Sequence, residues 1–279
     1  MESLKRILVI GKNDRSTKHI NAIKKISKIK INHISYREFI AKNELKEDYD
    51  FFLVCAKWDK NYQVVNALVK KISGKTILSE KPLTKPVKFL NKNKLILLYD
   101  RRHYKNINLV KKKIDQNKPN TVFINFSDDF HEKKDRLNLK EVEDYLHIYF
   151  VHVIDTIIYL FGEIQDFTRI YNSTTFNTYL LSIKKTKIFI NIFKQEIKFT
   201  QISIVNDKMD MFLFENLETL RFCNSNNKLD NFPLENREKV LEKMWSNVIN
   251  SITTEKFTTI NEESINNKLI NFFKRGQKC

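Results

Sequence analysis

Short apolar runs alternate with amphipathic segments along residues 6–114, and this alternation limits the possible folds more than any other feature. Strands are predicted at residues 6–10, 30–35, 50–56, 76–78 and 95–99, most of which are apolar runs. Between them, segments such as residues 16–28 and 64–72 place apolar side chains at helical spacing. Strands that alternate with helices predict a doubly wound parallel sheet.

The pattern changes after Pro119. Residues 121–126 are rich in strand-forming side chains, residues 141–161 predict a long helix, and residues 166–224 predict several consecutive strands. Two further helices are predicted at residues 235–252 and 262–275. Consecutive strands after an α/β half predict a second domain. We therefore expect a Rossmann domain at 1–118 and an α+β domain with an open, mostly antiparallel sheet at 119–279.

The chain is strongly basic, with 50 Lys and Arg against 33 Asp and Glu and a net charge of +17. One interpretation is a nucleic-acid or anionic-membrane partner. The other is a composition enriched in Lys, Asn and Ile throughout, with the lysines on solvated faces. No block of like charge is longer than Lys111–Lys113, and aromatic residues do not alternate with arginines. These observations favour the second interpretation, with neither nucleic acid nor membrane as a partner.

The three cysteines, Cys55, Cys223 and Cys279, are odd in number and lack metal-type spacing. They indicate reduced thiols rather than a disulfide framework. The apolar run that ends at Ile10 is too short for a signal peptide, and residues 150–161 are too short to cross a bilayer. We expect a soluble, cytoplasmic protein. The acidic cluster at residues 128–132 fits no familiar metal site, and we predict no metal.

The first predicted strand ends at Gly11, where a dinucleotide-binding fingerprint would begin. Asn13 and Ser16 occupy the places of its second and third glycines. Asn tolerates a left-handed backbone and Ser is small, so the turn remains feasible. We predict that Gly11, Asn13, Asp14, Arg15 and Ser16 bind a dinucleotide. The alternative is a Rossmann shell that has lost its cofactor.

The end of the second strand bears on the choice of cofactor. It reads Ser35-Tyr36-Arg37, with no carboxylate at the tip, although Glu38 follows. An acidic residue there accepts the ribose hydroxyls of NAD, whereas an arginine accommodates the 2′-phosphate of NADP. Ser35 and Arg37 therefore favour NADPH, with NADH as the alternative. Arg37 is otherwise an ordinary exposed arginine.

Glu80-Lys81-Pro82 follows a strand that begins after Gly74. Ligands of open α/β sheets bind at the carboxyl ends of the strands. A lysine there can donate a proton or hold a reacting atom by charge, and desolvation can lower its pKa. We predict that Lys81 is catalytic and, with Glu80 and Cys55, contacts the cofactor. The alternative is a surface lysine after a strand.

These motifs together resemble the Gfo/Idh/MocA oxidoreductases, the glucose-fructose oxidoreductase and inositol dehydrogenase family, over nearly the whole length. The matching segments are residues 7–19 with the fingerprint and His19, 50–68, 74–84, 97–102, His152 with Asp155, 160–162, 239–252 and 264–273. Gly11, Gly74 and Gly162 fall at family positions, and only Gly276 does not.

The resemblance assigns roles in the second half of the chain. His152 matches the family's catalytic histidine, a proton donor, although a lone histidine on an apolar helix is more often a core residue. Asp155 would orient His152 or a substrate hydroxyl, or pair with a lysine. Arg102 would bind a substrate carboxylate or phosphate, or form a structural ion pair; His152 would also contact the substrate.

One departure concerns the reaction. Family members that oxidise sugar alcohols place an aspartate four residues before this histidine, whereas this chain has Ile148 there, followed by Tyr149. We therefore expect NADPH-dependent reduction of a C=N, C=C or C=O bond in a small biosynthetic intermediate at an interdomain cleft. His152, Lys81 or Tyr149 would donate the proton. The alternative is an inactive binding protein that retains the fold. The resemblance also implies a homo-oligomer formed through the second-domain sheet.

Overall fold

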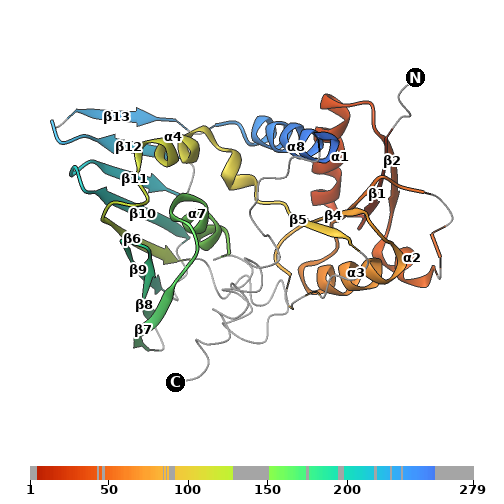
Figure 1. The fold of residues 1–279 in the computed structure, drawn as a ribbon, viewed down its shortest axis with the longest axis horizontal. Helices are drawn as coiled ribbons and strands as arrows, with labels where there is room; N and C mark the ends of the chain where they lie inside the picture. Colours follow the sequence, from red (N-terminus) through yellow and green to blue (C-terminus); the bar gives the residue numbers. More distant parts are fainter. Residues whose placement is uncertain are drawn as a thin grey trace. The chain divides into compact units, whose positions relative to one another are not determined.

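The computed structural model describes residues 5–42, 44–45, 48–83, 85, 87, 92–127, 151–173, 176–193, 198–216, 219–226, 228–233 and 235–254 (Figure 1). Contacts divide the chain into two compact units. The first comprises the residues up to Asp100 and helix α8 (Arg237–Thr254), and the second the residues from Arg101 to Asn236.

The first unit contains a five-stranded parallel sheet in the order β2-β1-β3-β4-β5. Its strands are β1 (Arg6–Ile10), β2 (Lys30–Ile34), β3 (Phe51–Val54), β4 (Thr76–Ser79) and β5 (Lys94–Leu97), with helices α1 (Asp14–Ile26), α2 (Tyr36–Ala41) and α3 (Trp58–Lys71) between them. The doubly wound parallel sheet is thus confirmed. The strand order reverses between β1 and β3, and such a switch point is where open α/β sheets bind ligands.

The core of this unit explains the unbroken apolar runs of the sequence. All four residues of β3 are buried, as expected for a parallel strand covered on both faces. One face packs Phe51 and Leu53 against Ile23 of α1 and against Met244 and Trp245 of α8. Helices α1 and α8 therefore lie side by side (Figure 1).

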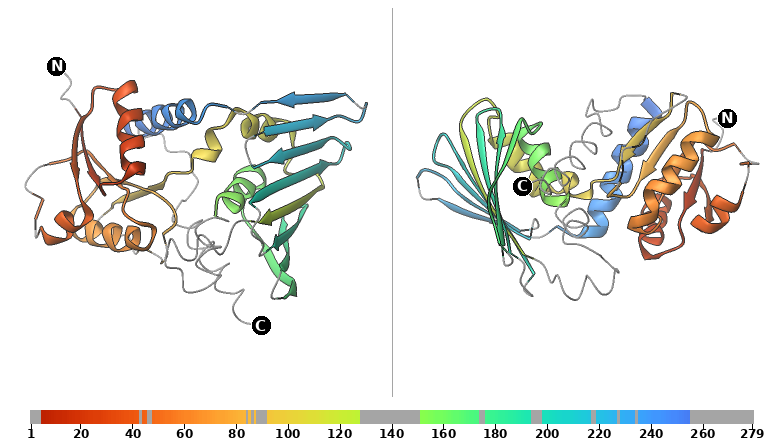
Figure 2. Two further views of the ribbon diagram at one scale, coloured as in Figure 1. Left: turned by 180° about the vertical axis from the view of Figure 1, so that it is seen from behind. Right: turned by 90° about the horizontal axis from the view of Figure 1, so that it is seen from below.

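The second unit contains an eight-stranded sheet in the order β13-β12-β11-β10-β6-β9-β8-β7. Its strands are β6 (Asn120–Ser127), β7 (Asp166–Asn172), β8 (Phe176–Ile183), β9 (Thr186–Phe193), β10 (Phe199–Asn206), β11 (Met211–Glu215), β12 (Thr219–Cys223) and β13 (Leu229–Phe232). Every neighbouring pair is antiparallel except β6 and β9. The mostly antiparallel second sheet is confirmed. Helices α4 (Lys105–Lys113) and α7 (Val151–Phe161) lie on one face of it, and the described residues place no helix on the other (Figure 2).

The division differs from the expected boundary after residue 118. We assigned the helix at 235–252 to the second domain, but as α8 it packs on α1 in the first unit. The first unit also ends at Asp100, directly after β5, so α4 belongs to the second. The amphipathic pattern of α8 shows that one face is buried without showing which neighbour buries it.

Some predictions lie outside the described residues: Tyr149 and Ile148, the acidic cluster at 128–132, Cys279, and the helix at 262–275. Of the long helix expected at 141–161, the structure describes α7. Within the described part of the chain, no helix has the length and apolar character needed to span a membrane.

Candidate functional site

The turn between β1 and α1 requires glycine at position 11. Gly11 has φ of +121°, and a Cβ atom there would lie 2.2 Å from the carbonyl oxygen of Cys55. The main chain after β3 therefore closes against the turn at the switch point. The amide of Gly11 also donates to the carbonyl of Ile34 at the end of β2 (2.8 Å). Three strands meet at this turn.

Asn13 performs a different task from the one its place in the fingerprint suggested. From the sequence we expected Asn13 to be suited to a left-handed backbone. Its φ is −156°, in the extended region. Its Oδ1 accepts from the amide of Ser16 (3.0 Å) while the Ser16 hydroxyl accepts from the Asn13 amide (3.0 Å). This capping box starts α1. Asn13 Nδ2 also donates to the carbonyl of Cys55 (2.6 Å), which turns the side chain toward β3.

Ser16 and Cys55 are both fully buried. Ser16 thus meets the need for a small residue where α1 packs closely on the sheet. The Cys55 side chain belongs to the apolar core, and burial raises the pKa of its thiol well above the ordinary value. The part of Cys55 that faces the β1–α1 turn is its carbonyl, which accepts from Asn13.

The end of β2 also forms a capping box. Ser35 Oγ accepts from the amide of Glu38 (3.2 Å), and Glu38 Oε2 accepts from the amide of Ser35 (2.5 Å). The hydrogen bond from Ser35 lowers the pKa of Glu38, and Lys12 lies 3.5 Å from the same carboxylate. The Ser35 hydroxyl is thus used to begin α2. Arg37 remains exposed beside Tyr36.

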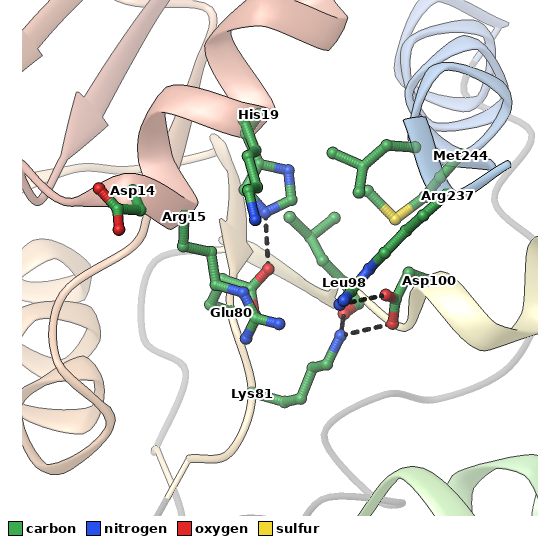
Figure 3. A pocket seen from close by; sticks show the side chains of 11 residues that line it. Asp14, Arg15, His19, Glu80, Lys81, Leu98, Asp100, Arg237 and Met244 are labelled. Atoms are coloured by element: carbon green, nitrogen blue, oxygen red, sulfur yellow. Dashed lines mark hydrogen bonds and ion pairs between the residues drawn. The ribbon is translucent and has the colours of Figure 1, made fainter. Parts of the chain in front are cut away.

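Lys81 lies just past the carboxyl end of β4 and is buried, with its side chain only 2% exposed. It is not a surface lysine. Its Nζ donates to the carbonyl of Leu98 (2.6 Å) and to Oδ1 of Asp100 (3.0 Å), both of which follow β5 (Figure 3). Arg237, at the start of α8, lies 3.5 Å from the other Asp100 oxygen.

Glu80 is buried beside Lys81, and its carboxylate contacts two side chains of α1. Its Oε1 lies 2.6 Å from Nε2 of His19 on α1, and its Oε2 lies 3.0 Å from the guanidinium of Arg15 (Figure 3). Burial alone would raise the pKa of this carboxyl, but the charges of Lys81 and Arg15 and the His19 hydrogen bond lower it to about 2. Glu80 is therefore a carboxylate in a pocket wall.

Trp245 of α8 extends this group of residues. Its indole Nε1 donates to Nδ1 of His19 (2.9 Å). Sequence reasoning counted His19 only as part of the family pattern and gave Trp245 no role. The available signal was a histidine on the apolar face of α1; the 226 residues between the partners left no local signal for the pairing.

These side chains line a pocket of about 220 Å³ within the first unit, which we call the charged pocket (Figure 3). Its walls come from α1, the segments after β4 and β5, and α8. Its charged side chains are the cations Arg15, Lys18, Lys81 and Arg237 and the carboxylates Asp14, Glu80 and Asp100. Among the described residues, no group of three or more His, Cys, Asp or Glu side chains could hold a metal ion.

The remaining predicted residues belong to the second unit. Arg102 Nε donates to both oxygens of Asp155 (3.0 and 3.2 Å), and its Nη2 donates to Oδ1. Asp155 therefore pairs with an arginine. For Arg102 we considered binding a substrate anion or forming an ion pair within the protein, and the structure shows such an ion pair. His152, half-buried on α7, accepts at its carbonyl from the Thr156 hydroxyl (2.9 Å).

No protein-family model matches this chain, and no curated protein matches it. Several solved structures do. A Gfo/Idh/MocA family oxidoreductase from Vibrio cholerae has 12% identity and a TM-score of 0.70 over 96% of this chain and 95% of that one. The chain has the two-domain fold of the Gfo/Idh/MocA oxidoreductases.

Two other solved structures are similar to this chain over nearly its whole length. A putative NADPH-dependent oxidoreductase from Desulfitobacterium hafniense has 15% identity and a TM-score of 0.73, with 98% and 94% of the two chains covered. An oxidoreductase from Agrobacterium radiobacter, in complex with NAD⁺, L-tartaric acid and magnesium, has 12% identity and a TM-score of 0.72, with 98% and 95% covered.

The first unit of this Gfo/Idh/MocA fold has residues that fit a dinucleotide. The close approach of Gly11 to Cys55 leaves a tight turn before α1. Because Asn13 directs its amide toward Cys55, its side chain is drawn to β3 rather than outward from the turn. Arg15, in the first turn of α1, adds a cation beside the place where a diphosphate binds in such folds.

Proposed function

We propose that the protein is an NAD(P)-dependent oxidoreductase. The observation that supports this most is that Gly11 and Lys81 lie at the same edge of one parallel sheet, just past the carboxyl ends of β1 and β4. That edge is where open α/β folds bind nucleotides. The turn at Gly11 would accept the diphosphate, with Arg15 beside it. Lys81 would contact the nicotinamide region.

We further propose a preference for NADPH. Glu38 is held by the Ser35 amide and by Lys12, so it is not positioned as a ready acceptor for ribose hydroxyls. Arg37 supplies an exposed cation at the end of β2, which suits a 2′-phosphate. Ser35, with its hydroxyl used in the cap, contributes less than we expected from the sequence.

For the chemistry, we propose the reduction of a C=N, C=C or C=O bond. The nicotinamide, when bound, supplies a hydride. Lys81, held by Leu98 and Asp100, would be a hydrogen-bond donor at a fixed position. His152 remains the proposed proton donor, with Tyr149 as the sequence-based alternative. We assign Asp155 a structural role, because Arg102 donates to both of its carboxylate oxygens.

Titration calorimetry with NADPH and NADH tests the proposal. We expect NADPH to bind with a Kd in the micromolar range and NADH to bind more weakly. A Kd of about 1 μM corresponds to a binding free energy of about −8 kcal/mol. Arg37→Ser should weaken NADPH binding about tenfold, the effect of losing one charge-assisted contact, and leave NADH unchanged. Lys70→Ser is the matched control, because it removes an exposed cation from the last turn of α3. If neither nucleotide binds at a concentration of about 1 mM, the proposal is wrong, because any binding free energy is then weaker than roughly 4 kcal/mol.

Two observations favour the alternative of an inactive binding protein. The buried Lys81 is already neutralised by Asp100, and Asn13 replaces the glycine that lets the main chain approach the diphosphate. The same titrations, followed by turnover assays with imines, enones and ketones, separate the two functions. Nucleotide binding with hydride transfer to one substrate class supports the enzyme; nucleotide binding without transfer to any of them supports the alternative.

We also propose that the protein forms a homo-oligomer through the face of the second sheet that carries no described helix. On this face, Thr178, Asn191, Asn125 and Gln201 form a hydrogen-bonded row across β8, β9, β6 and β10. Phe123 lies on the same face as Asn125, is 45% exposed and stacks on Phe189. Apolar side chains around a satisfied polar row suit a protein interface.

Light scattering after size-exclusion chromatography tests this assembly. Phe123→Glu should give monomers. Met209→Glu, at a 72% exposed turn between β10 and β11, should leave the assembly unchanged. If the wild-type protein is still a monomer at a protein concentration of about 100 μM, the proposal is wrong. Its free energy of association would then be weaker than roughly 5 kcal/mol.

A further inference from the structure

Trp245, His19 and Glu80 form a buried chain of hydrogen bonds from α8 to the wall of the charged pocket. Trp245 is fully buried, and His19 and Glu80 are each 3% exposed. The distances are 2.9 Å from the indole Nε1 to His19 Nδ1 and 2.6 Å from His19 Nε2 to Glu80 Oε1. The indole and imidazole rings also meet edge to face, with centroids 5.6 Å apart.

The chemistry of the three groups fixes where the imidazole carries its proton. An indole N–H can only donate, so Nδ1 of His19 must accept and has no hydrogen. The ring proton is therefore on Nε2, from which it is donated to the carboxylate of Glu80. The opposite tautomer would place two lone pairs face to face at 2.6 Å and lose the indole bond as well.

The position of Glu80 matters because its other oxygen holds Arg15. With Oε1 fixed by His19, Oε2 lies 3.0 Å from the Arg15 guanidinium. Arg15 extends from the first turn of α1 and is itself exposed. This contact is an ion pair without hydrogen-bond geometry, so it keeps the guanidinium near Glu80 by charge. A cation held near its site in advance favours an anionic ligand.

We propose that Trp245 and His19 are positioning residues: the indole selects the Nε2–H tautomer of His19, which fixes Glu80 and, through it, directs Arg15 toward the diphosphate of a bound dinucleotide. This inference rests on the proposed nucleotide-binding function. It makes α8, more than 130 residues beyond β5 in the sequence, part of the nucleotide site. It also gives His19 a role distinct from packing.

The first measurement reads the tautomer and does not depend on any ligand. The ring ¹⁵N shifts of His19 at neutral pH, assigned by their loss in His19→Gln, should show one neutral Nε2–H form in the wild type. Trp245→Phe keeps an aromatic ring on α8 and removes the donor to Nδ1. Glu80 still accepts from Nε2, so the single neutral form should be lost through a second proton on Nδ1. Val248→Ala removes volume from the same core, one turn along α8, and should leave the His19 signal unchanged.

The second measurement is nucleotide affinity in the same proteins. Trp245→Phe and His19→Ala should weaken binding about tenfold, the effect of losing one hydrogen bond to a charged group. His19→Gln should retain affinity within about twofold, because its amide can both donate to Glu80 and accept from the indole. Val248→Ala should bind as the wild type does. Rescue by glutamine separates positioning from packing, because glutamine restores the bonds and not the ring.

The outcomes are distinct. A wild-type Nε2–H signal that persists in Trp245→Phe, with unchanged affinity, overturns the inference, as does a His19→Gln protein as weak as His19→Ala. If wild type binds neither nucleotide, the proposed function fails, and the ring signal alone then decides whether Trp245 sets the tautomer.

Discussion

The ammonium of Lys81 lies 3.0 Å from Oδ1 of Asp100, and this ion pair joins the segments that follow two neighbouring parallel strands. Both side chains are buried, at 2% and 6% exposure. A charge removed from water is costly unless its partner stays in place, so the two residues should behave as one unit.

The costs of removing the two partners should therefore not add. We expect Lys81→Met and Asp100→Asn each to lower the free energy of unfolding by about 3–5 kcal/mol, because each breaks the buried ion pair and leaves the other charge in the protein interior. The double variant should lose clearly less than the sum, with a coupling energy above about 1 kcal/mol. Urea denaturation measures all three.

The exposed pair between Lys75 and Asp48, at 2.8 Å, provides the control. Lys75→Met should change the free energy of unfolding by less than about 1 kcal/mol. Additive effects of the two Lys81–Asp100 substitutions would show that the buried pair contributes no coupling.

Substitutions at the helix cap Asn13 should change the stability of the protein and its affinity for nucleotides in different ways. Asn13→Ala should cost about 1 kcal/mol of stability, whereas glycine, a tolerated cap, should cost only about a few tenths. Glycine also removes the side chain between the turn and β3, and it lets the main chain approach a diphosphate. We therefore expect Asn13→Gly to bind NADPH more tightly than wild type, in titration calorimetry run beside the unfolding measurements. Weaker binding by Asn13→Gly would show that the Asn13–Cys55 bond is needed to shape the turn.

The sequence was sufficient to predict the parallel sheet, because strands covered on both faces leave unbroken apolar runs such as β3. It also located the glycine turn and the lysine after β4, since each follows its strand directly in the chain. It placed α8 with the second domain, whereas α8 packs on α1, because helical periodicity identifies a buried face without identifying the neighbour. It missed the pairing of Trp245 with His19 for the same reason, and it left open the pairing of Arg102 with Asp155, which depends on packing between distant elements.

Glu80 should make the protein sensitive to acid. Its pKa in the folded protein, about 2, lies below the ordinary 4.5, so ionised Glu80 stabilises the fold above about pH 4.5. That stabilisation is lost as the pH falls from 4.5 toward 2. In full it amounts to about 3 kcal/mol, of which roughly 2 kcal/mol should disappear between pH 6 and pH 3. Urea denaturation of wild type and Glu80→Gln at both pH values tests this, because the other carboxylates cancel in the difference. An equal stability gap at both pH values would mean that Glu80 is not a depressed carboxylate.

The Arg102–Asp155 pair should govern the local stability of α7. Asp155 is fully buried, so Arg102→Met leaves a carboxylate without its main partner and should destabilise the second unit by about 3–5 kcal/mol. Adding Asp155→Leu should recover much of this loss, since an apolar pair replaces the charges.

Hydrogen exchange at the amides of Val151–Phe161 is the suitable measurement of this loss. Tryptophan fluorescence would not report on α7, because both tryptophans belong to the first unit. Arg221→Met, which breaks an exposed pair with Glu215 in the same unit, should change exchange by less than about 1 kcal/mol. If the double variant exchanges as fast as Arg102→Met, Asp155 does more than pair with Arg102, and a direct role beside His152 would regain support.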